Sequence, residues 1–362
     1  MKILHIYKDY PPILGGIENH VRFLAEGQAG RGHDVTVLVT NPQGRRTTVA
    51  AEGGVRVVRA GRLATVASTP LSLALPWQLL GARPDVVHLH YPYPVGETAQ
   101  WLLRRGRATV LTYHADIVRQ KMILRFYRPL LERVLRRADA IIIGSPPMRG
   151  GVFLGAHGGK LRLIPYGIPL ERFAAQRIEA NRRIVGRTLL FVGRLRHYKG
   201  LDYLIRALPQ IDARLVVVGI GPMATEWRAL ADELGVAAKI DWLGEVGDDE
   251  LPALYHWADV FVLPASNASE AFGLVQVEAM AAGSPAVSTE LGTGTSYVNQ
   301  HGVTGLVVPP RDSDALAQAI NTLLADERLR RSMGEAARAR VNAEFALDVM
   351  VDRVLGLYRE LL

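Results

Sequence analysis

Two carboxylates stand in the apolar stretch EAFGLVQVEAMAAG, residues 270–283. Glu270 and Glu278 are separated by seven mostly apolar residues, whereas a solvated helix would surround them with polar side chains. If the stretch from residue 272 is a helix, the two acids lie about 12 Å apart along its axis. That separation suits two ends of one elongated ligand better than a carboxylate pair acting on one bond. We therefore expect a ligand, rather than bulk water, to pair with them.

Basic side chains follow a strand-like run in the middle of the chain. The segment FVGRLRHYKG carries Arg194, Arg196 and Lys199 where that strand should end. Arginine presents a planar fork of donors and lysine a compact charge, and together they suit a diphosphate. An exposed basic loop is the alternative. The position at the carboxyl end of a strand favours the anion site.

Two further motifs follow strand-like runs in the N-terminal half. Gly15 and Gly16, in YKDYPPILGGIENH, precede a helix expected near Ile17. Backbone N–H groups at that helix start either bind a phosphate or only form a turn. His114 and Asp116, in TVLTYHADIVRQ, either form an acid/base pair or include a structural histidine whose nitrogens are hydrogen-bonded. Both questions stay open on the sequence alone.

A glycine pattern that resembles a dinucleotide-binding fingerprint occurs in VVVGIGPMATE. Gly219, Gly221 and Ala224 have the G-x-G-x-x-A spacing, and Asp241 follows at a suitable distance. The fingerprint belongs on the first strand of its unit, whereas this run is the second strand of its domain. An oxidoreductase is therefore the distant alternative.

An acidic pair precedes a helical stretch near the C-terminus. Asp312 and Asp314, in PRDSDALAQAI, could hold a divalent metal with a nucleotide diphosphate. Because the pair directly precedes a run of Ala, Leu and Ile, capping by an Asp or Ser side chain explains it better. We expect no metal and no bound cofactor.

The elements that must position these residues are β-branched strands alternating with helices. Twelve apolar strand-like runs recur along the chain: KILHIY, HDVTVLVT, VRVVRA, DVVHLH, TVLTYH, AIIIGS, TLLFVG, RLVVVG, KIDWLG, DVFVLP, PAVST and GLVVPP. Such alternation indicates parallel sheets covered on both faces. The pattern restarts after the Arg-rich stretch AAQRIEANRRIVGR, with a new strand at Leu189, so this stretch is interpreted as a linker.

The restart divides the chain into two doubly wound domains. We expect a first domain at 1–172, a second domain at 173–345, and a last helix at 346–362 that packs back on the first domain. In such sheets ligands lie beyond the carboxyl ends of the strands. The active site is therefore expected in the cleft between two facing domains.

Composition and charge bound the function further. The 362 residues include no cysteine, which excludes disulfides and thiolate metal sites and is compatible with a reducing compartment. Neither a signal peptide nor an apolar run long enough to cross a bilayer is present, so we expect a cytoplasmic protein.

Residues 1–180 hold 25 Lys and Arg against 12 Asp and Glu, a net charge of +13, whereas the remainder has −5. An anionic membrane or a phosphorylated acceptor suits the basic half.

A basic amphipathic stretch at residues 119–137, RQKMILRFYRPLLERVLRR, is the strongest membrane signal. It either contacts the inner face of an anionic membrane peripherally or is a core helix with a basic solvent face, and both interpretations stay open. Nucleic acid is not expected, because no zinc knuckle, basic zipper or aromatic-basic RNA signature occurs.

Five motifs in order resemble the retaining glycosyltransferases of family 4. They are GGIENH, YHAD, GRLRHYKG, the Glu-x7-Glu stretch EAFGLVQVE, and GVTGLVVPPRDSDALAQAI. The resemblance covers nearly the whole chain and implies the GT-B fold, in which two Rossmann-like domains face each other across the active site. It implies a hexosyltransferase that uses a nucleotide sugar and no metal. It also implies that residues 1–172 form the acceptor-side domain and residues 173–345 the nucleotide-sugar-binding domain.

The resemblance also implies roles for individual residues. Glu278 would hold the ribose hydroxyls of the nucleotide sugar, while Arg194 and Lys199 would neutralise its diphosphate and stabilise the leaving group. Glu270 would bind the sugar hydroxyls, and His114 would touch the sugar at the reacting face. His114, Glu270, Arg194 and Lys199 thus form the expected catalytic set.

The remaining donor-binding positions act through backbone or apolar contacts. Val246 would line the pocket for the base, and Gly15 and Gly16 would lie at the phosphates, with a backbone contact from Gly16. The backbone at the start of the Glu-x7-Glu helix would bind the sugar and phosphates through Phe272, Gly273, Leu274 and Val275.

The stretch YHADIVRQKMILRFYRPLL is similar to a bacterial branch of the family that builds surface polysaccharides. That similarity favours GDP-mannose or a related GDP-sugar as donor, and a glycan or lipid-linked acceptor. Ala115 stands where that branch more often has Ser. The alternatives are a UDP-sugar-dependent glycosyltransferase, a GT-B nucleotide-sugar epimerase, and a sugar-binding scaffold without turnover.

Overall fold

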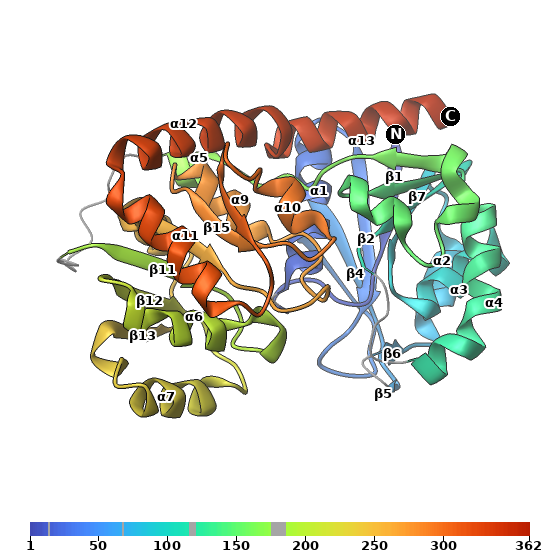
Figure 1. Ribbon diagram of the computed structural model, residues 1–362. Coiled ribbons are helices and arrows are strands. Elements are labelled where there is room, and N and C mark those ends of the chain that lie inside the picture. Colours follow the sequence, from blue (N-terminus) through green and yellow to red (C-terminus); the bar gives the residue numbers. More distant parts are fainter. Residues whose placement is uncertain (14, 67–68, 116–120, 175–185) are drawn as a thin grey trace. The chain divides into compact units, whose positions relative to one another are not determined.

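The structure is a computed structural model and describes residues 1–13, 15–66, 69–115, 121–174 and 186–362. The chain divides into two compact units. Unit 1 comprises Met1–Ile168 with Leu347–Leu362, and unit 2 comprises Pro169–Ala346. Figure 1 shows the elements of both units. Each unit is built on a sheet of its own.

Unit 1 has an eight-stranded sheet with the order β10-β9-β8-β7-β1-β2-β4-β3. All its neighbours are parallel except the pair β3–β4. The strand bounds are β1 Lys2–Ile6, β2 Asp34–Thr40, β3 Thr48–Glu52, β4 Val55–Ala60, β7 Val86–Tyr91, β8 Ala108–Tyr113, β9 Ala140–Ile143 and β10 Leu161–Leu163. A separate antiparallel pair joins β5 Ala64–Val66 to β6 Thr69–Leu71. The strand order reverses direction between β1 and β7.

Helices cover the unit 1 sheet, and every residue of its strand β7 is buried, as is usual for parallel sheets covered on both faces. The α-helices are α1 Gly16–Gly30, α2 Ala74–Gly81, α3 Pro94–Leu103, α4 Lys121–Arg137 and α13 Leu347–Leu361, with short 3-10 helices η1 Pro146–Gly150 and η2 Gly155–Lys160. The C-terminal α13 packs against α1 (Figure 1). Its buried Val351 would meet a side chain placed at Gly27 of α1, which shows how closely the two helices approach.

Unit 2 has a six-stranded parallel sheet with the order β13-β12-β11-β14-β15-β16. Its strands are β11 Thr188–Val192, β12 Arg214–Val218, β13 Ile240–Gly244, β14 Val260–Leu263, β15 Ala286–Thr289 and β16 Gly305–Val308. This is the doubly wound order, and it reverses between β11 and β14, which pair directly. In open α/β sheets, ligands bind at the carboxyl ends of the strands where the order reverses.

The helices of unit 2 include several short ones that follow strands. They are α5 Glu171–Ala174, η3 His197–Lys199, α6 Leu201–Ala207, η4 Leu208–Gln210, α7 Ala224–Glu233, η5 Ala237–Lys239, α8 Leu251–Trp257, α9 Leu274–Ala281, α10 Gly294–Val298, α11 Ser313–Ala325 and α12 Glu327–Glu344. None of the helices in the described ranges is both long enough and apolar enough to cross a bilayer.

The two Rossmann-like α/β units with parallel sheets confirm the expected fold class. All twelve predicted strand runs are strands. The sequence-based boundary was placed after residue 172, and the structure divides the units after Ile168. Most of the predicted linker, residues 175–185, lies outside the described residues. The cleft between facing domains stays a prediction.

Candidate active site

A buried ion pair joins the two loops at the reversal point of the unit 2 sheet. Lys199 ends η3, which follows β11, and Glu270 lies in the loop after β14. The Lys199 Nζ is 2.6 Å from Glu270 Oε2, and each residue is only 8% exposed. Burial opposes the lysine charge, but the charge and hydrogen bond of Glu270, together with the nearby Tyr198 and Glu278, outweigh burial, so the pKa of Lys199 is raised. Lys199 is therefore a permanent cation at this site.

Glycine allows the two loops to approach this closely. Gly200 has a φ of 66°, and a Cβ there would clash with the carbonyl oxygen of Pro264, the residue after β14. The Ser266 N–H also donates to the Tyr198 carbonyl oxygen at 2.8 Å. The loop after β14 thus packs on η3. A side chain at position 200 would push the two loops, and with them Lys199 and Glu270, apart.

Glu278 has a different partner from Glu270. It lies within α9, and Tyr255 of α8 donates its hydroxyl to Glu278 Oε2 at 2.7 Å. Burial raises the pKa of Glu278 to about 7, although the Tyr255 hydrogen bond and the charge of Arg172 oppose the shift. Glu278 is half-buried, and its second carboxylate oxygen can accept hydrogen bonds from hydroxyl groups.

The helix that carries Glu278 begins with amide groups that no side chain caps. Gly273 is its N-cap residue, with a φ of 78°, and α9 starts at Leu274 rather than at residue 272. The first N–H groups of a helix have no partner within it, so the amides of Leu274 and Val275 can donate to an anion. Phe272, just before them, is buried.

The other predicted unit 2 residues lie in loops of the same sheet. Arg194 is exposed in the loop between β11 and η3, as is Arg196. Val246 is half-buried in the loop between β13 and α8. Arg172 donates to the Asp248 carbonyl oxygen at 2.7 Å and so holds that loop. The structure directly joins Lys199 with Glu270, and it gives Arg194 no ion pair with either carboxylate.

The predicted residues of unit 1 follow two strands of its sheet. Gly15 is the N-cap of α1, and the carboxylate of Glu18 lies over it, in the space that a Cβ would take. Around Gly16, in contrast, a Cβ would meet no described atom within 4 Å. Open space beside Gly16 is compatible with the predicted phosphate contact, which stays a prediction.

His114, at the end of β8, is buried and uses both ring nitrogens. Its Nε2 lies 3.1 Å from His90 Nδ1, and its Nδ1 lies 3.0 Å from the Tyr166 hydroxyl. Asp116, the other member of the proposed acid/base pair, lies outside the described residues. A sugar contact through the His114 ring requires one of these hydrogen bonds to break, and this role stays a prediction.

Local structure explains the glycine motif and the acidic pair without a ligand. Asp312 is the N-cap of α11 and accepts from the Ala315 N–H at 2.9 Å, which confirms the cap interpretation. A Cβ at Gly219 would clash with the Gly193 carbonyl oxygen, so that glycine allows two loops to touch. Asp241 forms an ion pair with Arg214 at 2.7 Å.

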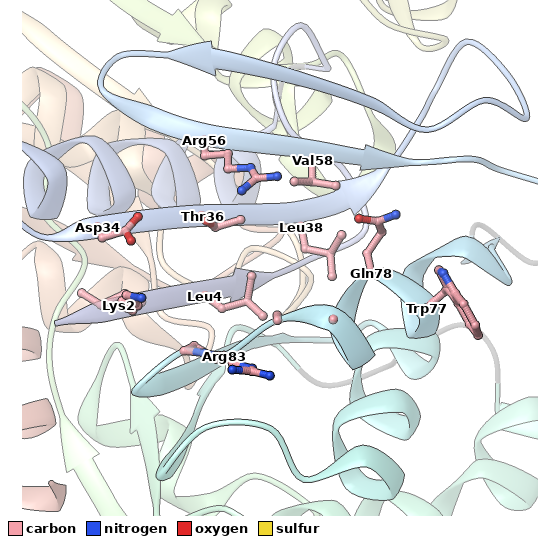
Figure 2. Close-up of a pocket in the computed structure, with 14 residues that line it drawn as sticks. Lys2, Leu4, Asp34, Thr36, Leu38, Arg56, Val58, Trp77, Gln78 and Arg83 are labelled. Carbon is pink, nitrogen blue, oxygen red and sulfur yellow. The ribbon is translucent and has the colours of Figure 1, made fainter.

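A pocket of about 430 Å³ lies elsewhere in unit 1, beside α2 (Figure 2). Its walls include Lys2 and Asp34, the first residues of β1 and β2, together with Arg56 and Arg83. These strand starts lie at the amino ends, away from the carboxyl ends where α/β sheets bind ligands. The lining includes none of the predicted site residues.

Sequence reasoning missed the residues that hold the predicted ones in place. Tyr255 was not foreseen, because one tyrosine in a helical stretch carries no spacing signal. His90 was not foreseen either, although the H-x-H pattern of His88 and His90 in one strand places both side chains on one face. That alternation is the signal that could have identified it.

The chain matches two family models that together cover most of its length. Residues 14–172 match a model described as Glycosyltransferase Family 4, and residues 175–340 match one described as Glycosyl transferases group 1.

Three curated relatives match almost end to end. The O-antigen chain mannosyltransferase C of Escherichia coli is 36% identical, over 100% of this chain and 99% of the relative. The D-rhamnosyltransferase WbpZ of Pseudomonas aeruginosa is 39% identical, over 95% and 92%. A GDP-mannose-dependent alpha-(1-6)-phosphatidylinositol monomannoside mannosyltransferase of Mycobacterium tuberculosis is 32% identical, over 99% and 98%.

Proposed function

The chain belongs to glycosyltransferase family 4 and is a hexosyltransferase with the GT-B fold, and we propose that it transfers a mannosyl or related residue from a GDP-sugar. The acceptor is a glycan or a lipid-linked glycan, and the anomeric configuration of the sugar is retained. The relatives support this choice of sugar, since two are named for mannose and one for D-rhamnose, which is mannose without its 6-hydroxyl group. The name of one relative supports GDP as the carrier.

The observation that carries this proposal is the buried pair of Lys199 and Glu270 at the strand-order reversal. In the reaction the bond between the sugar C1 and the diphosphate oxygen breaks, and negative charge grows on the departing diphosphate. Lys199 is held as a cation and stabilises that charge, with Arg194 added from the solvent side. Glu270, fixed by the same ion pair, accepts hydrogen bonds from the sugar hydroxyls.

The carboxylate of Glu278 binds the nucleoside end of the donor. Tyr255 orients it, and two vicinal ribose hydroxyls suit a carboxylate acceptor. The diphosphate then lies between the two glutamates, at the uncapped amides of Leu274 and Val275.

Transfer proceeds without a divalent metal in this proposal. Lys199, Arg194 and the α9 amides neutralise the diphosphate, and Asp312 is engaged as a helix cap. Mg²⁺ and Mn²⁺ are the ions to test, because they prefer oxygen ligands such as those of a diphosphate. Transfer activity is measured with and without excess chelator, and again after either ion is added back.

A panel of nucleotide sugars, assayed for release of nucleoside diphosphate with and without a bacterial lipid-linked glycan extract, tests the proposed function. We expect GDP release from GDP-mannose or GDP-D-rhamnose that depends on the extract and yields glycosylated product. Release from UDP-sugars instead overturns the donor assignment. Isomerised sugar without an acceptor indicates an epimerase, and binding without turnover indicates a scaffold.

A further inference from the structure

Five buried histidines meet in the core of unit 1. They lie on the adjacent strands β1 and β7, directly after the neighbouring strand β8, and on helix α1. All are less than 5% exposed: His5, His20, His88, His90 and His114. Burial lowers the pKa of each of them, that of His20 to about 3 and that of His5 to about 4. Each ring is therefore neutral at pH 7 and has one unprotonated nitrogen.

Four of the five histidines have partners for both ring nitrogens. His5 bonds Gln28 Oε1 at 2.8 Å and His90 Nε2 at 3.0 Å, and His90 in turn bonds His114. His88 bonds the Tyr358 hydroxyl at 2.5 Å and the Thr112 hydroxyl at 2.7 Å. In these contacts each neutral imidazole can donate a hydrogen bond through one nitrogen and accept one through the other.

His20 is the exception. Neither of its ring nitrogens has a hydrogen-bond partner among the described residues, although the side chain is only 4% exposed. Its ring faces those of His90 and His114, at centroid distances of 5.7 and 5.1 Å and nearly perpendicular to both. A buried imidazole without a partner costs free energy, so the arrangement points to a missing polar ligand between these rings.

We propose that His20, His90 and His114 form a three-histidine site for a divalent transition-metal ion of the Zn²⁺ type. One ring nitrogen from each lies within 4.8 Å of the others. Three nitrogens around tetrahedral zinc lie about 3.3 Å apart, so only a small closure of the rings is required. The all-imidazole ligand set excludes Mg²⁺ and Ca²⁺, which take oxygen ligands.

Outer contacts hold two of the ligands in the orientation that a metal requires. With His114 Nε2 on the metal, its Nδ1 donates to the Tyr166 hydroxyl. With His90 Nδ1 on the metal, its Nε2 donates to His5, whose other nitrogen is held by Gln28. Such second contacts fix the tautomer of metal-bound histidines. A water molecule completes the fourth position.

A second group, His5, His88 and His90, also brings three ring nitrogens within 4.8 Å. It is the weaker candidate, because His5 and His88 already bond other partners through both nitrogens. A metal there would break the bond between His5 and His90 and one bond of His88, and every ring in that group already has its partners. At the first site a metal replaces only the His90–His114 bond and supplies the interaction that His20 lacks.

The test is a titration of the untagged, full-length protein with Co²⁺ and then Zn²⁺ after removal of metals by a chelator. We expect one equivalent of Co²⁺ to produce the intense visible absorption of tetrahedral coordination, Zn²⁺ to displace it, and the melting temperature to rise by several degrees. His20→Gln should lose this absorption. The matched control His301→Gln, which alters an exposed histidine of unit 2, should keep it.

Three results would overturn the site. One is the absence of tetrahedral Co²⁺ absorption in the unaltered protein, a measurement that does not depend on any variant folding. Another is full retention of stoichiometric binding in a His20→Gln protein that melts like the metal-free parent. The third is loss of binding in His88→Gln but not in His20→Gln, which would assign the metal to the other group.

Discussion

At the scale of single residues, the two glutamates of the Glu-x7-Glu stretch differ in their partners. Glu270 is paired with a buried lysine, whereas Glu278 accepts from a tyrosine hydroxyl. Different partners imply different contributions. In the proposed function, Glu270 is paired with the cation that stabilises the leaving group, and Glu278 accepts from the ribose hydroxyls. Kinetics of the two variants can separate these contributions.

Glu278→Gln should raise the KM for the donor about ten- to hundredfold with a smaller change in kcat, because a charged hydrogen bond made equally in ground and transition states is lost. Binding of GDP, measured by calorimetric titration, should weaken by a similar factor. Glu270→Gln should instead lower kcat about a hundredfold and leave GDP affinity nearly intact, since it orients the sugar.

The exposed acid Glu233 of α7 offers a matched control, because Glu233→Gln removes the same charge away from the site. Melting curves accompany the titrations. If both site variants lose GDP affinity equally, or both unfold, the two glutamates have no separate roles and act only as structural acids.

The pKa of Glu278 predicts how donor binding depends on pH. Only the ionised carboxylate accepts from both ribose hydroxyls, and its pKa in the free protein is about 7. Affinity for GDP-mannose, which does not itself titrate in this range, should rise from pH 6 to pH 8 and then level off. Glu278→Gln should remove the rise. An identical pH profile in the variant would assign the dependence to another group.

The same pKa has a consequence for stability, with a defined sign. The folded carboxyl holds its proton to a higher pH than the ordinary value of 4.5, so unfolding releases a proton between about pH 4.5 and 7. The contribution of Glu278 to the free energy of unfolding therefore falls as the pH rises through this window and is constant above it. In thermal melts, the stability of Glu278→Gln should therefore fall less over this pH window than that of the unaltered protein.

At the scale of elements, the contact between η3 and the loop after β14 depends on Gly200. Gly200→Ala places a methyl group against the Pro264 carbonyl oxygen, in addition to the cost of a left-handed backbone. Gly235 has nearly the same φ, 68°, and a methyl group added there would meet no described atom within 4 Å, so it is the matched control.

We expect Gly235→Ala to cost about 1–2 kcal/mol of unfolding free energy, and Gly200→Ala to cost about 1–3 kcal/mol more. Gly200→Ala should also lower kcat, since it displaces Lys199 from Glu270. Chemical denaturation and steady-state kinetics measure both effects. Equal stability of the two variants would mean that the loop contact is not tight.

Helix α4 has a basic solvent face, and membrane contact through it is a prediction. In its described side chains, Leu131, Val134 and Leu135 are buried in the core of unit 1, while Arg133 and Arg136 are on the solvent side. The solvent side of α4 can therefore contact a membrane through charged side chains, not apolar ones. Flotation should therefore show binding to anionic vesicles that salt weakens and that is absent from zwitterionic vesicles.

The double change of Arg133 and Arg136 to Glu should reduce that binding several-fold. The same change at Arg328 and Arg331, which lie in α12 of unit 2, is the matched control for net charge. Equal binding of both variants, or equal binding to neutral vesicles, would leave α4 as a core helix with a solvated basic face.

Strand and helix patterns were readable from the sequence, whereas side-chain pairing was not. The apolar runs predicted the central strands, but β3, β5, β6 and β10 were missed because exposed or very short strands lack an apolar pattern. Lys199 was selected by its position after a strand, and Glu270 by the apolar stretch around it. Their ion pair depends on β11 and β14 being neighbours, which is a property of strand order that no local pattern carries.

At the scale of the whole molecule, each unit has one reversal of strand order, and predicted residues follow the strands there. Unit 2 supplies cations, carboxylates and uncapped helix amides, which suit a nucleotide sugar. In the proposed function, unit 1 binds the acceptor. The proposed function therefore requires that one chain both break the bond from the sugar to the diphosphate and form a new glycosidic bond.

The most direct test follows ¹³C-labelled GDP-mannose by NMR in the presence of a lipid-linked glycan extract and excess chelator. We expect the GDP-mannose signals to be replaced by those of an α-mannoside, with release of one GDP for each sugar transferred. A β-linked product would contradict retention. Unchanged GDP-mannose, in a sample where a UDP-sugar is consumed, would contradict the proposed donor.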